Sequence, residues 1–367
     1  MILTLLLYSF IAFTSIQIIY YLIFSSVLFE SKKKKENRKD IPISIIICAK
    51  NEAKNLELFL PSILNQEYPD FEVVLINDAS SDETLEVMKS FEEKHSNIKV
   101  IDVKNIEAFW GNKKYALTLG IKAAKNENLL FTDADCKPVS NKWIYKMTKH
   151  FNIEKTIVLG YGKYKKEKSL LNLIVRFETL ITAIQYFSYA KIGSPYMAVG
   201  RNLAYHRSEF FNTKGFINHM HIKSGDDDLF IQDAANKLNT TISISKDSFT
   251  ESIAPTSFKE WFYQKRRHIS TSNHYKFKHK FFLGLFFISK AIFYLLAILL
   301  FFFFPWKLIL SILLTYYSVQ FIVISFASKK FNESTITSFL PLLEIGLLIF
   351  HFSIFITNLS SKPNHWK

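Results

Sequence analysis

The feature that most constrains this chain is its first 29 residues, which contain no charged side chain. About 20 consecutive apolar residues are enough to cross the hydrocarbon core of a bilayer. A cleaved secretory signal would begin with basic residues and would carry a shorter apolar run, and this segment has neither property. We therefore predict that residues 1–30 form a retained transmembrane anchor, which excludes a simple soluble globule.

The anchor is followed directly by a lysine-rich linker at residues 31–40, with six basic residues and two acidic ones. Basic residues beside a span mark its cytoplasmic side. The domain that follows is therefore expected to be cytosolic, on the plasma or inner membrane. A solvated linker could have the same composition, but its position beside the anchor favours attraction to anionic lipid headgroups.

A second apolar block occupies residues 281–358. It contains three apolar stretches, which are Phe281–Phe304, Leu308–Ala327 and Phe339–Asn358. The first two are expected to cross the membrane as a hairpin around Pro305. The third also has the composition of a span, although it includes one glutamate and one histidine. The sequence thus predicts two or three transmembrane helices here, three or four in all, and leaves open the side of the tail at residues 359–367.

Residues 256–280 precede this block and are predicted to lie at the membrane surface. The part from Lys259 to Lys280 has seven basic residues, one acidic residue and several aromatic ones, which suits the headgroup layer. The whole chain has 46 Lys and Arg against 32 Asp and Glu, a net charge of +14, and nucleic acid binding could also explain that charge. Because much of it lies beside the spans, we predict a membrane partner and no nucleic acid.

Residues 41–255 differ from the flanking parts, because short β-branched runs alternate there with amphipathic stretches. The pattern predicts strands at 43–48, 71–76, 98–103 and 129–132, and helices at 52–65, 80–93 and 112–125. Ser80 and Glu83 are expected to form a capping box at the start of the second helix. This alternation implies an α/β fold with a mostly parallel sheet and helices on both faces. With only two cysteines, a disulfide-stapled scaffold is excluded.

Polar residues follow three of the predicted strands. Glu52 comes after the first, Asp78 after the second, and Asp133 and Asp135 after the fourth. Ligands of open α/β sheets collect at the carboxyl ends of the strands, and neighbouring carboxylates repel one another unless a cation or ligand hydroxyls compensate them. Asp133 and Asp135 could offer oxygen ligands to Mg²⁺ or Mn²⁺, or they could be ordinary turn or capping residues.

The second half of the domain adds an acidic cluster, Asp226–Asp228, at the start of a helix predicted over residues 229–238. These aspartates could complement the helix dipole, or their repulsion could tune one of them for general-base chemistry. Further on, the segment 264–268 supplies two adjacent arginines, which could hold a diphosphate or contact the membrane surface. The glycine signatures of dinucleotide oxidoreductases and P-loop NTPases do not occur in the sequence.

In their order along the chain, these residues resemble the motifs of the family 2 glycosyltransferases, and the flanking spans resemble the membrane-associated subset. The resemblance covers roughly residues 41–275 and implies a GT-A type, Rossmann-like sheet. Its motifs are ISIIICAKNE at 43–52, INDASSDET at 76–84, Lys-x-x-Ala-Leu at 113–117, TDAD at 132–135, GRN at 200–202, GDDD at 225–228 and Gln-x-x-Arg at 264–267. Each motif is unspecific alone, whereas the ordered set is specific.

The resemblance implies a role for each matching residue on the donor side. Glu52 and Asp78 would contact the nucleoside, and Lys113 would lie beside the diphosphate. Asp133 would approach the nucleotide, and Asp135 would ligate the divalent metal, Mg²⁺ or Mn²⁺.

It also implies roles on the catalytic side. The catalytic acidic residue would be Asp226 or Asp227, and Asp227 is our preferred choice. Gln264 and Arg267 match the family's Gln-x-x-Arg element, and Arg266 beside them is a further candidate for substrate contact. His268 occupies the position of the family's Trp, which argues against a processive polymerase.

We therefore predict an inverting glycosyltransferase that moves a sugar from a nucleotide donor, with UDP favoured, to a lipid or lipid-linked acceptor at the cytosolic membrane face. The apolar stretch Leu170–Tyr189 is the candidate location for the lipid, although a packed helix would have the same pattern. Two alternatives stay open. One is a processive polysaccharide synthase of the same family, and the other is a catalytically inactive membrane scaffold.

Overall fold

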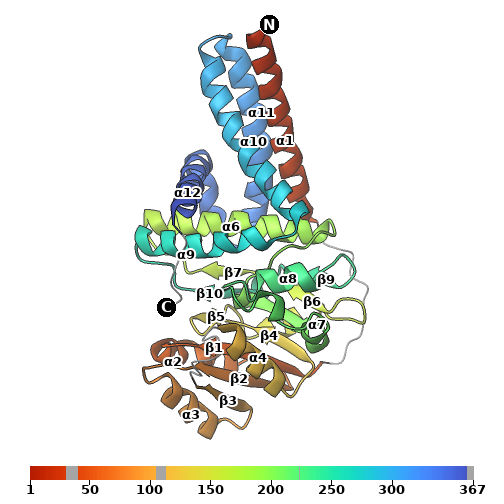
Figure 1. Ribbon diagram of the computed structural model, residues 1–367, viewed down its shortest axis with the longest axis vertical. Helices are drawn as coiled ribbons and strands as arrows, with labels where there is room; N and C mark the ends of the chain where they lie inside the picture. The colour runs from red at the N-terminus through yellow and green to blue at the C-terminus, as the bar shows by residue number, and fades with distance from the viewer. Residues whose placement is uncertain (30–39, 105–112, 223, 362–367) are drawn as a thin grey trace.

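The structure is a computed structural model that describes residues 1–29, 40–104, 113–222 and 224–361. It has three parts: an α/β domain, a layer of two long helices on top of it, and a bundle of long helices that projects away from the domain (Figure 1). Except for Asp40, the predicted lysine-rich linker lies outside the described residues.

The main sheet of the domain has seven strands in the order β3-β2-β1-β4-β8-β6-β9. Strands β3, β2, β1 and β4 are parallel, β8 is antiparallel to both β4 and β6, and β9 is parallel to β6. The mostly parallel sheet predicted from the sequence is thus confirmed. Strand bounds are β1 Ile43–Ala49, β2 Phe71–Asp78, β3 Ile98–Val103, β4 Asn128–Phe131, β6 Ile157–Leu159, β8 Leu203–His206 and β9 Thr240–Ile242.

A smaller sheet of three strands has the order β5-β10-β7 and lies between the main sheet and the two-helix layer (Figure 1). Its strands are β5 Cys136–Pro138, β10 Thr250–Ser252 and β7 Gly162–Tyr164. Strand β5 follows the Asp133–Asp135 turn directly, so this sheet fixes the turn that carries the two aspartates. The backbone N–H of Cys136 donates to the carbonyl of Asp133 at 3.1 Å and tightens the same turn.

Helices cover both faces of the main sheet. Successive side chains of a strand point to opposite faces, so Ile45 and Ile47 of β1 pack with Leu56 on one face, while Ile46 packs with Ala116 on the other. The helices of the domain are α2 Ala53–Leu64, α3 Thr84–Lys94, α4 Lys113–Ala123, α5 Trp143–Thr148, α7 Arg207–Asn212 and α8 Asp228–Ala234.

Two local predictions are wrong. The capping box of Ser80 and Glu83 does not form: the Thr84 N–H at the start of α3 donates to Asp82 Oδ1 at 3.1 Å, and Ser80 Oγ instead accepts the N–H of Asn51 at 3.0 Å. Ser80 therefore connects two loops of the sheet edge. The helix predicted over 229–238 is α8, which ends at Ala234 because a polar turn follows, closed by Asn236 N–H donating to Asn239 Oδ1 at 2.8 Å.

Helices α6 (Leu170–Lys191) and α9 (Phe258–Thr271) form the layer above the domain. Each begins at a serine whose hydroxyl accepts a backbone N–H of the first turn: Ser169 from Asn172 at 3.0 Å, and Ser257 from Glu260 at 3.2 Å. Such caps satisfy N–H groups that would otherwise have no helical partner. The apolar stretch predicted as a packed helix or a lipid contact is α6, and most of it is buried.

Helices α1 (Ile2–Phe24), α10 (Phe277–Phe301) and α11 (Trp306–Lys330) form the projecting bundle (Figure 1). The turn between α10 and α11 lies at Pro305, as the predicted hairpin requires. With α6 and residues 334–360, these are five helices long and apolar enough to cross a membrane by length and composition. Large apolar side chains such as Leu295 and Ile322 are exposed on the bundle, as expected for a surface that faces lipid.

Helix α12 (Leu340–Ser360) covers nearly all of the third apolar stretch, which the sequence predicted as the possible third span of this block. Just before it, Glu333 pairs with Arg176 of α6. At its other end, Arg266 of α9 donates to the carbonyl oxygen of Ser361 at 2.6 Å. Both ends of α12 thus contact the α6–α9 layer, on which the helix lies in Figure 1, and residues 334–360 are long and apolar enough to cross a membrane.

Candidate active site

One large cavity begins at the carboxyl ends of β1, β2 and β4 and continues upward between α6 and α9. Its volume is about 1560 Å³. It is lined by all the residues that the sequence predicted for the site, which are Glu52, Asp78, Lys113, Asp133, Asp135, Asp226, Asp227, Gln264, Arg266 and Arg267. The tertiary structure therefore gathers residues up to 215 positions apart around one space.

The loops after β1 and β2 form the lower end of the cavity and are joined by hydrogen bonds. Asn51 and Ala79 both have a positive φ, 57° and 49°, a backbone conformation that is costly without glycine and concentrates at functional sites. Asn51 Oδ1 accepts the N–H of Ser81 at 2.8 Å, and the N–H of Glu52 donates to Thr84 Oγ1 at 2.8 Å. These bonds hold Glu52 in place next to the end of β2.

Asp78 ends β2 and is 4% exposed. Among the described residues, its Oδ2 has no hydrogen-bond donor although the atom is buried. A buried acceptor without a partner is costly, so the site fits a ligand that donates a hydrogen bond, such as a nucleoside base or ribose. Burial raises the pKa of Asp78, and the charges of Lys50 and Lys113 oppose this rise.

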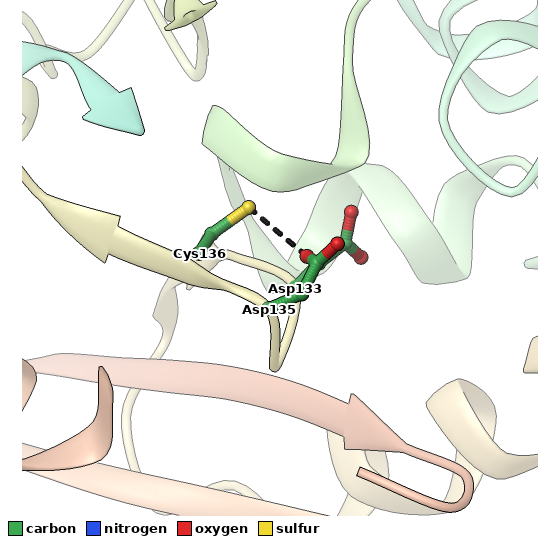
Figure 2. Close-up of side chains that lie close together, drawn as sticks. All are labelled: Asp133, Asp135 and Cys136. Atoms are coloured by element: carbon green, nitrogen blue, oxygen red, sulfur yellow. Dashed lines mark hydrogen bonds between the residues drawn. The ribbon is translucent and has the colours of Figure 1, made fainter. Parts of the chain in front are cut away.

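Asp133, Asp135 and Cys136 lie on the turn between β4 and β5, with their ligand atoms within 4.8 Å of one another (Figure 2). The Cys136 thiol donates to Asp135 Oδ1 at 3.2 Å. Burial raises the pKa of this thiol well above its ordinary value, so it stays protonated and is a poor metal ligand. The two carboxylates fit the oxygen preference of Mg²⁺ and Mn²⁺.

Lys113 connects the two acidic groups of the site. Its Nζ lies 2.8 Å from Asp133 Oδ1 and 3.2 Å from Asp226 Oδ2. Burial disfavours charge at Asp133, but the Lys113 ammonium outweighs this effect and lowers the Asp133 pKa. Burial raises the pKa of Asp135, and the charge of Asp133 adds to that rise. A divalent cation between the two aspartates would relieve this repulsion.

The neighbouring Lys114 is the side chain that holds the acidic cluster in position. Its Nζ donates to the carbonyls of His219, Ile222 and Ser224 at 2.7, 3.0 and 2.9 Å. Those carbonyls belong to the segment that leads into the aspartates. The two adjacent lysines at the start of α4 thus differ in role. Lys113 pairs with carboxylates of the site, and Lys114 fixes the loop that leads into the aspartates.

The three aspartates of the cluster have different surroundings. Asp227 Oδ2 accepts the N–H of Gly200 at 2.6 Å and its Oδ1 accepts the N–H of Asp228 at 2.8 Å. Asp228 is buried and accepts from Thr271 Oγ1 at 2.5 Å and from Tyr275 OH at 2.6 Å. Burial raises the pKa of Asp227 to about 8, and the charges of Asp226 and Asp228 contribute to the rise.

Helix α9 supplies the upper wall next to the aspartates. Gln264 Oε1 is buried and has no donor among the described residues, so it is another position that a ligand hydroxyl could satisfy. The charges of Asp226, Asp133 and Asp227 act on Arg267, although its burial is the larger influence and lowers its pKa. Burial and the cations Lys265 and Arg267 lower the pKa of His268 well below its usual value, so a neutral ring faces the cavity.

Arg266 has a different environment from Gln264 and Arg267. Its Nε donates to Asn358 Oδ1 at 2.8 Å and its Nη2 to Ser361 Oγ at 2.8 Å. Its guanidinium is therefore committed to the end of α12. Arg266 therefore holds α12 in place, and it also lines the cavity in which the sequence predicts its substrate contact.

Arg201 is a site residue to which the sequence analysis gave no role, although the motif GRN contains it. It lines the cavity, its guanidinium carbon lies 4.5 Å from the ring centre of Tyr164, and its Nη1 donates to Ser252 Oγ at 3.3 Å. The tight turn at Gly200, which bonds Asp227, places it there. The sequence signal that could have identified Arg201 is its place in the GRN motif, between the TDAD and GDDD motifs.

The mostly parallel sheet with carboxylates at its strand ends is the arrangement that the motif resemblance implies, that of the GT-A type of nucleotide-sugar transferases. Residues 44–220 match the profile of Glycosyl transferase family 2. This part of the chain belongs to that family, as the motifs predicted.

The chain is similar to other transferases over parts of its length. Over 147 residues it is 32% identical to the poly-beta-1,6-N-acetyl-D-glucosamine synthase of Staphylococcus epidermidis, which covers 40% of this chain and 34% of the relative. Over 93 residues it is 32% identical to the cholesterol galactosyltransferase of Borreliella burgdorferi, which covers 25% of each. The chain spans about a third or less of the length of these curated relatives.

Among solved structures, the fold is similar to that of a mannosyltransferase from Pyrobaculum calidifontis in complex with GDP-Man and Mn²⁺. The TM-score is 0.58 at 14% identity, and the match covers 94% of this chain and 98% of the other. This likeness extends beyond the family domain and includes the helices that follow it.

Proposed function

We propose that this protein is an inverting glycosyltransferase that moves a sugar from a nucleotide-diphosphate donor to a lipid or lipid-linked acceptor at the cytosolic membrane face. The observation that carries the proposal is the single cavity that joins the strand-end carboxylates to the apolar helices above them. A UDP-sugar is the favoured donor from the motif resemblance, and the relatives' names include both a polymer synthase and a sterol glycosyltransferase.

The donor would occupy the lower end of the cavity. Asp78, with its unsatisfied oxygen, and Glu52 would contact the nucleoside. Lys113 and Arg267 would neutralise charge on the diphosphate. Asp135, with Asp133 beside it, would hold Mg²⁺ or Mn²⁺, which supplies further charge neutralisation to a leaving diphosphate.

The acceptor hydroxyl would attack the anomeric carbon from the face opposite the diphosphate, so that one displacement inverts the configuration. A carboxylate would take the hydroxyl proton. The sequence analysis preferred Asp227 for this task, but its contacts favour Asp226. Both Asp227 oxygens accept backbone N–H groups, and with a pKa of about 8 it would be largely protonated at neutral pH. Asp226 lies against Lys113 on the donor side.

A purified full-length chain in detergent tests the proposal. With Mn²⁺ and a panel of UDP-glucose, UDP-galactose, UDP-N-acetylglucosamine and GDP-mannose, we expect release of nucleoside diphosphate from at least one donor. Asp226→Asn and Asp135→Ala are each expected to lower that rate at least about a hundredfold. Asp247→Asn, at a half-exposed carboxylate outside the cavity, is the control and should retain the rate. Full activity in Asp226→Asn together with loss of activity in Asp227→Asn would show that Asp227 is the general base.

Processive synthesis of a polysaccharide is the second candidate, supported by the similarity to the Staphylococcus synthase. Product length decides between the two, because a single transfer adds one sugar per acceptor. The neutral ring of His268 in place of the family's Trp favours single transfer. Calorimetry tests the third candidate: if no nucleotide-sugar gives heat of binding, the result would favour the inactive scaffold.

A further inference from the structure

The cavity of the candidate active site continues past α9 into an apolar arm. The arm is lined by Leu283, Phe286 and Phe287 of α10 and by Leu347, Leu348 and Phe355 of α12. These positions recur at the three- and four-residue spacing of one helix face, so α10 and α12 each turn a largely apolar stripe toward the same space, with His351 between Leu348 and Phe355 on α12. From Glu344 to Phe355 the stripe on α12 is about 16 Å long. An extended hydrocarbon chain matches this shape.

The basic side chains along the arm already have partners in the protein. Lys290 lies 2.5 Å from Glu344 Oε1, Lys265 pairs with Glu178, and Arg266 is committed to the end of α12. Placing an anionic lipid phosphate there would require breaking a buried ion pair, which leaves its carboxylate unpaired at a high cost. The arm therefore suits an uncharged part of a ligand.

The junction of the arm with the active site carries Asp226 and Asp227, with Arg267 of α9 within reach of their charges. The nearby Lys113 ammonium is shared between Asp226 and Asp133. A phosphate acceptor would meet repulsion from the Asp226 carboxylate, whereas a neutral hydroxyl can donate a hydrogen bond to it.

Given the proposed transferase function, on which this inference rests, we propose that the apolar arm binds the hydrocarbon chain of an uncharged lipid acceptor and delivers its free hydroxyl to the aspartates. A diacylglycerol has this chemistry. The reaction then replaces the sugar–phosphate bond of the donor with a sugar–oxygen bond to the lipid, the hydroxyl proton passes to the carboxylate, and the nucleoside diphosphate leaves.

Two adjacent residues of α12 provide a matched pair for the test. Leu348 lines the arm and is half-buried, while Ile349 is 62% exposed and points away from it. A tryptophan at Leu348 would fill the arm, and one at Ile349 would face the bilayer. The full chain is reconstituted in phosphatidylglycerol vesicles that contain either dioleoylglycerol or undecaprenyl phosphate, and sugar transfer from the active donor is measured.

We expect the wild type and Ile349→Trp to glycosylate dioleoylglycerol in preference to undecaprenyl phosphate, and Leu348→Trp to lose at least about tenfold of that rate. Calorimetry of donor binding to Leu348→Trp shows whether the variant is folded. If it is not, Leu348→Phe replaces it in the same comparison. Equal rates in both α12 variants would overturn the arm as the binding site, and preference for undecaprenyl phosphate would overturn the uncharged class. Donor turnover with no lipid product would reject this inference alone, whereas no donor turnover would reject the proposed function.

Discussion

At the scale of residues, the chemistry of the site depends on which carboxylates have a cation beside them. Lys113 meets Asp133 and Asp226, while the hydrogen-bond donors to Asp227 among the described residues are backbone N–H groups. Burial disfavours the charged form of a carboxyl group unless a cation compensates it. The three neighbouring aspartates therefore differ in chemistry although they share one sequence motif.

The raised pKa of Asp227 has a consequence for stability. Between pH 3.8 and about 8 the unfolded chain has this carboxyl ionised while the folded chain keeps it protonated, so the free energy of unfolding falls as the pH rises through this range. In Asp227→Asn, which mimics the protonated form, we expect the fall in Tm between pH values of about 5 and about 8 to shrink by a few degrees. Thermal unfolding without nucleotide or metal measures this, with Asp247→Asn as the control; an unchanged pH dependence would contradict it.

The residues that the sequence predicted for the site line one cavity in the structure, and they could be predicted together because strand ends and ordered motifs are local patterns. It could not decide between Asp226 and Asp227, since the choice depends on Gly200 and Lys113, which are distant in the chain. Arg266 was predicted to contact substrate because it lies beside Gln264 and Arg267 of the Gln-x-x-Arg motif. The structure turns its guanidinium to the end of α12, a direction that the spacing along α9 alone did not reveal.

At the scale of elements, α12 depends on buried polar contacts for its position. Glu344 accepts hydrogen bonds from Tyr21 of α1 at 2.9 Å, Tyr316 of α11 at 2.7 Å and Tyr294 of α10 at 2.6 Å, and it pairs with Lys290. One carboxylate therefore joins α12 to all three helices of the bundle. Apolar packing is not directional, so these contacts set where along the bundle α12 sits.

Removing one partner of this ion pair tests its role. Lys290→Met leaves the Glu344 carboxylate buried without its cation, which is expected to cost about 3–5 kcal/mol and to lower the Tm in detergent. In Lys290→Met/Glu344→Gln both charges are gone, and most of the loss should be recovered. Lys307→Met at the exposed α10–α11 hairpin is the matched control. Equal Tm values for the single and double variants would show that the unpaired charge is not the cause.

At the scale of the whole molecule, the distribution of lysines gives the bundle an orientation. The domain end of α10 and α11 carries several lysines and the hairpin end carries one; they are Lys276, Lys278, Lys280, Lys329 and Lys330 against Lys307. Basic residues favour the cytoplasmic side of a span. With three helices in the bundle and α12 returning to the layer, we propose that the domain and residue 361 share the cytosolic side.

Cysteine labelling in right-side-out vesicles tests this arrangement. Phe303→Cys lies at the hairpin and is 58% exposed in the wild type, and Leu359→Cys lies near the end of α12 at 73%. A membrane-impermeant maleimide should label Phe303→Cys from outside and Leu359→Cys only after permeabilisation. The wild type, with Cys48 and Cys136 on the domain side, is the control for background. Labelling of Leu359→Cys from outside would show that α12 crosses the membrane.

The sheet, its strand-end carboxylates and the apolar helices could all be predicted from the sequence, because each follows from a short-range pattern of burial. The patterns are a period of two in strands, a three- to four-residue period in helices, and uninterrupted apolar runs for lipid. Which helices pack against one another depends on the tertiary structure. Residues 339–358 are as apolar as a span, and polar contacts fix where α12 lies: Asn358 and Ser361 bond Arg266 of α9, and Glu344 pairs with Lys290 of the bundle. Composition measures how apolar a helix is, whereas its position is fixed by a few directional contacts between residues far apart in the chain.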